Sequence, residues 1–202
     1  EFPELCGVEQ EVVNRCANPN IGNRFIEIMR NYELRVKEAG SGFHMNPSPG
    51  NVKDGLITDA MKSAGAARKG GTSPVVDVLD FPGWVTKNGL SLLSTAGTDV
   101  ESTTALAGAG ANRILFTTGL GTPPGNPGAP GINNSSHSKT ANSFHEYIDF
   151  DTGPVIDGSE TGESIGEKLL NEVIEYASGN KKTKSTIQGR DDFLPWKRGM
   201  SL

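Results

Sequence analysis

Apolar residues recur at helical spacing in the early part of the chain, which predicts three helices before any strand. The first follows Pro3, a favoured first helical residue, and ends before Asn18 and Pro19. The second is longer and amphipathic, and it ends at Gly40. The third ends with Arg68, Lys69 and a glycine cap. The apolar positions that define the three helices are Leu5, Val8, Val12 and Cys16; Ile21, Phe25, Ile28, Tyr32 and Val36; and Ile57, Ala60, Met61 and Ala64.

Beyond the third helix the pattern changes to short apolar runs bounded by Gly, Pro or Asn, which is typical of buried strands. These runs are 75–79, 90–93 and 114–117. Between the last two, residues 99–109 fit a helix with Asp99 as its N-cap, so a strand, helix, strand unit results. We therefore predict an α/β fold in which a mostly parallel sheet includes the three runs and helices flank it.

The rest of the chain contains one long loop and one strong helix. Residues 119–135 show no periodicity, and a segment of that length without secondary structure is typical of a functional loop. Ile165, Leu169, Val173 and Ala177 then predict an amphipathic helix that ends before Gly179. The predicted organisation is a single domain over residues 1–180, followed by a C-terminal tail over 181–202 that Phe193, Pro195 and Trp196 pack.

Charge and composition exclude several classes of partner. The formal net charge is −5, so no basic field exists that would attract a phosphate backbone or anionic lipid. No run approaches the ~20 apolar residues of a membrane span, and the start lacks the features of a signal peptide. Cys6 and Cys16 lie in the first predicted helix, too far apart along its axis for a disulfide. We therefore expect a cytoplasmic protein without nucleic-acid or membrane partners.

Three segments combine glycine or proline with groups that suit a small polyhydroxylated acid. Residues 117–125 follow a buried strand, and ligands of parallel sheets bind beyond the strand ends, although a structural turn explains the segment equally well. Residues 46–51 form a rigid turn with two amides and a hydroxyl, which suits either substrate recognition or helix capping. Residues 69–74 offer a cation and two hydroxyls, whereas a basic helix end is more often simply solvated.

The residues that commonly bind metals or start covalent reactions form no recognisable motif. His44, His137 and His145 lack the spacing of a known metal site. Glu4 and Glu9 flank the first helix, where they suit a base, a hard-metal ligand or the ordinary acids of a first turn. No Gly-x-Ser-x-Gly elbow and no paired cysteine motif is present, so covalent hydrolysis is not supported.

Several motifs follow one another along the chain: 2–9, 46–51 with 55–56, 62–65, 69–74, 107–112, 116–119 with 121–123, and 148–153. Taken in this order, they resemble the C-terminal domain of the altronate and galactarate dehydratase family, which also includes sulfolactate sulfo-lyase. Residues 191–199 are more similar to altronate than to galactarate dehydratases. Family enzymes carry a small N-terminal domain and a second domain ahead of this part, so the resemblance implies a C-terminal fragment of a larger enzyme.

The resemblance implies a hydro-lyase that converts altronate to 2-keto-3-deoxygluconate in hexuronate catabolism, with a divalent metal, Fe²⁺, as cofactor. Elimination beside a carboxylate needs a base, a cation near the enediolate, and an acid or Lewis acid on the departing hydroxyl. The candidate catalytic residues are Glu4, Glu9 and Lys62. The candidate substrate-binding residues are Asn46, Ser48, Asn51, Lys69, Thr72, Ser73, Thr117, Thr118, Gly121 and Thr122.

The metal ligands stay unassigned at this point. The low histidine content predicts that upstream domains supply some of them, which would place the active site at a domain boundary and leave this chain inactive alone. Expected partners are the sugar acid, the N-terminal domains of the same enzyme and a second copy in a homo-oligomer. We also expect the 46–51, 69–73 and 117–122 loops to surround one cavity. The alternatives are galactarate dehydratase, sulfolactate sulfo-lyase, a non-catalytic sugar-acid binding module and a scaffold.

Overall fold

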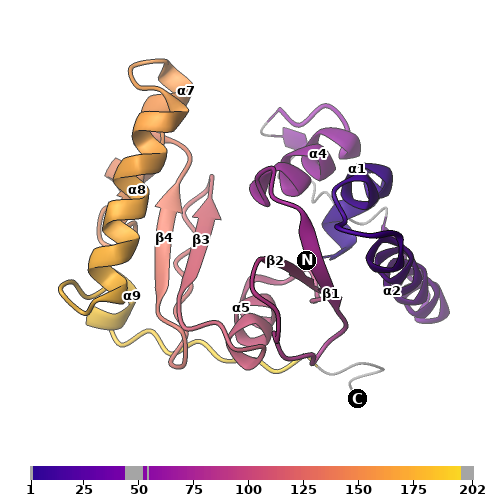
Figure 1. Ribbon diagram of the computed structural model, residues 1–202. Coiled ribbons are helices and arrows are strands. Elements are labelled where there is room, and N and C mark those ends of the chain that lie inside the picture. The colour runs from indigo at the N-terminus through magenta and orange to yellow at the C-terminus, as the bar shows by residue number, and fades with distance from the viewer. Residues whose placement is uncertain (1, 44–51, 54, 197–202) are drawn as a thin grey trace. The chain divides into compact units, whose positions relative to one another are not determined.

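A computed structural model describes residues 2–43, 52, 53 and 55–196, and their contacts divide the chain into two compact units. Unit 1 comprises Glu1–Ala109 with Pro195–Leu202, and unit 2 comprises Gly110–Leu194. Each unit contains a small sheet in which the strands pair in parallel and helices accompany them (Figure 1). The predicted α/β class with parallel strands is therefore confirmed.

Unit 1 begins with helices and continues with a two-stranded sheet. β1 and β2 run in parallel, with Val78 opposite Leu92. α2 and α4 confirm the second and third predicted helices, and Gly70 follows α4 as its C-cap. The elements are η1 (Phe2–Leu5), α1 (Glu9–Asn14), α2 (Pro19–Glu38), α4 (Asp59–Lys69), β1 (Val75–Leu79), β2 (Leu90–Leu93) and α5 (Asp99–Gly108).

Two sequence predictions about helix ends in unit 1 are wrong. The first predicted helix is divided into η1 and α1, because Gly7 between them adopts a φ of +88°, which a right-handed helix does not allow. The two cysteines therefore do not share a helix. Asp99 is the first residue of α5 rather than its N-cap, because the extended backbone conformation of a cap belongs to Thr98.

The core of unit 1 lies between α2 and β1. Phe25, Ile28 and Met29 project from one face of α2 and cluster with the buried strand residues Val75 and Val78. Phe2 joins this cluster from η1, and its ring meets the Phe25 ring edge to face at a centroid distance of 5.4 Å. The N-terminal segment is thus fixed to α2 by an aromatic pair.

Arg15 connects the end of α1 to the segment between α4 and β1. Its guanidinium donates hydrogen bonds to the carbonyl oxygens of Ala67 at 3.1 Å, Gly70 at 2.7 Å and Ser73 at 3.1 Å. Three carbonyl partners for one guanidinium define the path of the chain from the helix to the strand. The backbone of residues 69–73 is therefore positioned by a side chain that is distant in sequence.

Unit 2 is built on a three-stranded parallel sheet of order β3-β4-β5. β3 pairs with β4 over five residues, and β5 pairs with the end of β4. α8 confirms the strongly amphipathic helix predicted near the C-terminus. The elements are β3 (Ile114–Thr118), β4 (Gly131–Ser135), α6 (Ser138–Ser143), β5 (Phe150–Asp151), α7 (Pro154–Asp157), α8 (Gly162–Ala177) and α9 (Lys184–Ile187).

The sheets correct the predicted topology. All three predicted strands form, but β3 pairs with β4 in unit 2 and does not join β1 and β2 in one sheet. The predicted loop at 119–135 is also wrong in its last part, because β4 is a fully buried strand there. This strand was not predicted because Ile132 is the only large apolar residue in its sequence Gly-Ile-Asn-Asn-Ser. The fold accommodates the polar side chain of Asn133 by hydrogen bonds to the carbonyl oxygens of Pro124 and Tyr147.

Asp149 joins three elements of unit 2. Its carboxylate accepts hydrogen bonds from the backbone N–H of Asn133 at 2.8 Å and of Lys184 at 2.8 Å. The Tyr176 hydroxyl on α8 donates a third. Burial raises the pKa of Asp149 above its ordinary value, and burial together with the charge of Asp149 raises the pKa of Tyr176 to about 12. Asp149 thus links β4, α8 and the start of α9.

We predict that Asp149→Ala lowers the free energy of unfolding by about 1–3 kcal/mol, because it leaves buried N–H donors without an acceptor. Urea denaturation monitored by circular dichroism measures the change. Asp191→Ala is the matched control, because Asp191 is exposed, and its effect should stay within about 0.5 kcal/mol.

The wild-type protein and the Asp149→Ala variant also test whether the pKa of Asp149 is raised. A carboxyl group whose folded pKa lies above its unfolded value binds its proton more tightly in the folded state. The wild-type protein should therefore lose stability as pH rises from the ordinary value of 3.8 through the raised pKa, and the alanine variant should lack this component. Identical pH dependences in the two proteins would contradict the buried environment of Asp149.

Candidate active site in unit 1

An ion pair between η1 and α4 brings two candidate catalytic residues into contact. The ammonium nitrogen Nζ of Lys62 lies 3.0 Å from Oε1 of Glu4. The side chains are only 26% exposed for Lys62 and 18% exposed for Glu4. Because most of each side chain is removed from water, the two charges interact more strongly than a surface pair would. Their contact follows from the packing of η1 against α4.

Asp99 and Lys69 lie within electrostatic reach of this ion pair. Burial is the main cause that raises the pKa of Asp99, and the negative charge of Glu4 raises it further, while Lys69 and Lys62 act in the opposite direction. Glu4, Lys62, Lys69 and Asp99 therefore form a group of two carboxylates and two ammonium groups, which we call the charged cluster. A carboxylate with a raised pKa is a better proton acceptor than an ordinary one.

The local sequence explains how the elements present these side chains. Lys62 and Lys69 are two helical turns apart on α4, so they project from the same face. The hydroxyl of Thr58 caps the start of this helix by accepting from the N–H of Met61. Asp99 occupies the first turn of α5, a position that favours an acidic residue because the helix dipole is positive there.

Buried hydroxyl groups fix the start of α5 and hence Asp99. Thr95 and Ser102 are both buried, and their hydroxyl oxygens lie 3.2 Å apart. The Thr98 hydroxyl donates to the Glu101 carboxylate within the first turn. Sequence reasoning missed Asp99 as a site residue. The available signal was an acidic residue at the start of the helix that follows a parallel strand, which is a common place for ligand contacts.

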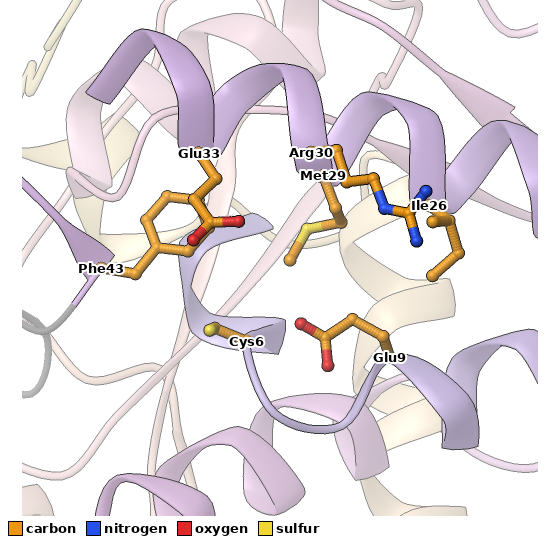
Figure 2. A pocket seen from close by; sticks show the side chains of 7 residues that line it. All are labelled: Cys6, Glu9, Ile26, Met29, Arg30, Glu33 and Phe43. Carbon is orange, nitrogen blue, oxygen red and sulfur yellow. The ribbon is translucent and has the colours of Figure 1, made fainter. Parts of the chain in front are cut away.

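Glu9 lies in a pocket between the segment that joins η1 to α1 and helix α2 (Figure 2). The cavity has a volume of about 290 Å³, close to the lower limit for small-molecule sites. Figure 2 shows the Glu9 carboxylate directed into the pocket, with Met29 and Arg30 above it on α2. One carboxylate oxygen accepts from the N–H of Gly7 at 2.9 Å, which fixes its orientation.

Three further candidates that the structure describes lie at the end of α4 and directly after it. Lys69 is the last residue of the helix, and the exposed side chains of Thr72 and Ser73 follow it. Arg15 holds the backbone of this segment through the carbonyl groups of Gly70 and Ser73. The segment is therefore both exposed and conformationally defined, as a ligand-binding loop requires.

Four candidate residues lie in unit 2, at the carboxyl end of β3. The buried hydroxyl of Thr118 accepts hydrogen bonds from the N–H groups of Gly121 at 3.0 Å and Thr122 at 3.1 Å. Gly121 has a φ of +95°, and a Cβ there would lie 2.6 Å from the Phe144 ring. Thr118 and Gly121 thus shape this loop. Thr117 precedes Thr118 on β3, so its side chain lies on the opposite face of the strand, and it is exposed.

Asn46, Ser48 and Asn51 lie outside the described residues. The expectation that the 46–51, 69–73 and 117–122 loops surround one cavity therefore involves both units and an undescribed segment. It stays a prediction.

Within the described residues, no group of three or more His, Cys, Asp or Glu side chains gathers to hold a metal ion. The charged cluster offers two carboxylates, and its ammonium groups would repel a cation. The described side chains alone thus do not fit a complete metal site, and we derive no chemical step through a metal. None of the helices among the described residues is long and apolar enough to cross a membrane.

Comparison with known proteins decides the family. The family model described as D-galactarate/Altronate dehydratase, C-terminal, matches residues 1–201. The chain belongs to this family. The resemblance inferred from the motifs is therefore confirmed.

Three relatives illustrate the match. Altronate dehydratase from Escherichia coli (strain K12) is 35% identical over 205 residues, covering 100% of this chain and 40% of the relative. Altronate dehydratase from Bacillus subtilis (strain 168) is 33% identical over 179 residues, or 89% of this chain and 36% of the relative. Galactarate dehydratase (L-threo-forming) from Escherichia coli (strain K12) is 35% identical over 180 residues, or 89% and 34%. The chain thus spans less than half the length of these relatives.

The two neighbouring threonines of β3 allow a matched test of the loop in unit 2. We predict that Thr118→Val lowers the free energy of unfolding by about 1–3 kcal/mol, because two N–H groups lose their buried acceptor. Thr117→Val, which has the same change of side chain at an exposed position, should change it by less than about 0.5 kcal/mol. Urea denaturation of both variants measures the difference. Equal losses would show that the Thr118 hydroxyl does not organise the loop.

Proposed function

We propose that this chain carries part of the active site of an altronate dehydratase, a hydro-lyase that forms 2-keto-3-deoxygluconate in hexuronate catabolism. Membership of the family supports sugar-acid dehydration, and two of the relatives are named altronate dehydratase. The observation that carries the proposal is the charged cluster, in which two carboxylates and two ammonium groups come from η1, α4 and α5.

The charges of the cluster suit the first step of the reaction. The proton on C2 of altronate is weakly acidic, and its removal places negative charge on the adjacent carboxylate. Lys62 and Lys69 bind that carboxylate and stabilise the developing enediolate. Lys69 makes the first contact because its side chain is exposed, whereas Lys62 is already paired with Glu4.

The carboxylates of the cluster supply the base. Asp99 is the favoured proton acceptor, since its raised pKa lies closer to neutral pH than that of an ordinary carboxyl group. Glu4 is the second candidate, and its ion pair with Lys62 orients it. After the C2 proton is removed, the C3 hydroxyl leaves with a proton as water, and the resulting enol becomes the 2-keto-3-deoxy acid.

The proposal includes partners beyond the described residues. It assigns a divalent metal, Fe²⁺, to ligands that come at least partly from other parts of a longer enzyme, because the described side chains form no complete ligand set. Upstream domains of such an enzyme would complete the site, consistent with relatives that extend well beyond the matched part. The cytoplasmic location, Glu9 as a catalytic residue, and Thr72, Ser73, Thr117 and Thr122 as substrate contacts stay predictions of the sequence.

A sugar-acid binding module without catalysis is the second candidate function. The pocket around Glu9 favours it, because Arg30 can pair with the carboxylate of a small hydroxy acid while Glu9 and Glu33 accept hydrogen bonds from its hydroxyl groups, without any metal. Galactarate and sulfolactate are the alternative substrates within the enzymatic proposal.

We predict that the 202-residue chain with ferrous iron fails to dehydrate altronate, whereas a full-length enzyme that carries this chain turns it over. Elimination needs base, cation and leaving-group acid in one preorganised geometry, and loss of one part costs orders of magnitude in rate. The assay follows 2-keto-3-deoxy acid from altronate or galactarate and sulfite from sulfolactate. Equal rates for the chain and the full-length enzyme would overturn the composite site.

We further predict that Asp99→Asn in the full-length enzyme lowers kcat by at least about 100-fold, because a general base contributes that much. Lys69→Met should instead raise KM, since it removes a charge that attracts the substrate carboxylate. The matched control is Glu11→Gln, an exposed carboxylate on α1, which should leave both constants unchanged.

Circular dichroism and thermal unfolding identify variants that fail to fold. A folded Asp99→Asn enzyme with an unchanged kcat would remove Asp99 from the reaction. If Glu4→Gln also kept its rate, the charged cluster would not be the active site. Tight binding of altronate by the full-length protein with no product from any of the three acids would favour the binding module.

A further inference from the structure

The cavity that Glu9 and Arg30 line in Figure 2, which we call the Glu9 pocket, takes no part in the reaction proposed for the charged cluster. Its wall on α2 consists of Ile26, Met29, Arg30 and Glu33. Positions 26, 29, 30 and 33 follow helical spacing, so the four side chains project from one face of the helix. The pocket shares no residue with the charged cluster, so it offers unit 1 a second place to bind a ligand.

The segment around Gly7 forms the wall opposite α2. Gly7 has a φ of +88°, so no right-handed helix runs through it, and α1 begins only at Glu9. The turn places Cys6 and Glu9 at the pocket. Because Oε2 of Glu9 accepts a hydrogen bond from the N–H of Gly7 at 2.9 Å, the carboxylate keeps its direction into the pocket without a ligand. Glu9 is therefore a preorganised anionic group.

Packed side chains form the apolar part of the pocket. Phe43 lines the cavity, and its ring meets the Tyr32 ring edge to face at a centroid distance of 5.6 Å. The Tyr32 ring in turn lies 5.4 Å from that of Trp196, which also belongs to unit 1. Met29 is buried in the core of the same unit. The apolar wall is thus fixed by contacts within unit 1 before any ligand binds.

Two opposite charges line the pocket without forming an ion pair with each other. Glu33 is already paired, because Nζ of Lys37 lies 2.8 Å from its Oε1. By contrast, no described residue forms an ion pair with Glu9 or Arg30. In Figure 2 the Arg30 guanidinium and the Glu9 carboxylate come from opposite walls. A ligand that carries both a negative and a positive group matches this arrangement, since each group meets a charge of opposite sign.

We propose that the Glu9 pocket binds a small α-amino acid with an apolar side chain. Arg30 pairs with the α-carboxylate of the ligand, and Glu9 accepts hydrogen bonds from its α-ammonium group. The ligand side chain packs against Ile26, Met29 and Phe43. A hydroxy acid would satisfy Arg30 but leave the negative charge of Glu9 without a counterpart, so the amino acid is the better match. The inference goes beyond the proposed function and does not depend on it.

An NMR titration of the 202-residue chain with free leucine and three analogues tests the proposal. Leucine should cause saturable shifts of the amides around Gly7 and Arg30, with a dissociation constant on the order of 1 mM because the ligand has few atoms. The analogue 4-methylpentanoate lacks the ammonium group, 3-methylbutylamine lacks the carboxylate, and 2-hydroxy-4-methylpentanoate replaces the ammonium group by a hydroxyl. Each analogue should bind about 10-fold more weakly or worse, because one charged hydrogen bond is lost.

Substitutions that remove charge but keep size locate the bound leucine. Arg30→Gln and Glu9→Gln should each weaken leucine binding by about 10-fold or more. The fold should remain, because Arg30 is exposed and the amide oxygen of a glutamine at position 9 can still accept from the N–H of Gly7. The matched controls are Arg35→Gln, at an exposed arginine of α2, and Glu11→Gln, at an exposed carboxylate of α1. Both should leave leucine binding unchanged.

Three results would overturn the proposal. The first is the absence of saturable shifts with leucine at about ten times the expected dissociation constant. The second is leucine binding that neither Arg30→Gln nor Glu9→Gln weakens, because the ligand would then lie elsewhere. The third is a hydroxy-acid analogue that binds as tightly as leucine. Glu9 would then not recognise an ammonium group, and the hydroxy-acid binding module would be favoured instead.

Discussion

The burial of Phe2 is the constraint on which the candidate site depends. η1 is a single short turn of 3₁₀ helix, and such a turn has little stability of its own. The Phe2 ring is almost completely buried against Phe25 of α2, so the turn takes its orientation from the core of unit 1. Glu4, two residues later, then meets Lys62 on α4. An exposed or smaller residue at position 2 would free the turn and separate the ion pair.

The same logic extends from the ion pair to the rest of the charged cluster. Arg15 holds the end of α4 and the segment after it through three carbonyl groups, which keeps Lys69 in the charged cluster. Buried hydroxyl groups hold the start of α5 and thereby Asp99. Chemical groups from three elements are thus positioned by buried contacts that do no chemistry themselves, as a preorganised site requires.

The sequence predicts those parts of the fold in which local periodicity and burial agree. α2 and α8 follow from long apolar stripes, and the apolar strands follow from short runs between turn residues. β4 could not be predicted because its buried positions are mostly polar, and the side chain of Asn133 is held by hydrogen bonds to the carbonyl oxygens of Pro124 and Tyr147 rather than by apolar packing. The assignment of strands to two sheets is likewise a long-range property. In the site, Glu4 and Lys62 were predicted as separate candidates, but their contact and the nearness of Asp99 depend on packing between segments far apart in sequence.

An NMR titration of the 202-residue chain with altronate tests most directly whether the charged cluster of unit 1 holds the sugar acid. We expect saturable shifts of the side-chain carboxyl signals of Glu4 and Asp99 and of the ammonium signals of Lys62 and Lys69. The pKa of Asp99 should also rise, because the bound carboxylate adds negative charge beside it. Saturable shifts elsewhere in the chain, with these four side chains unchanged, would show that the charged cluster does not hold the sugar acid.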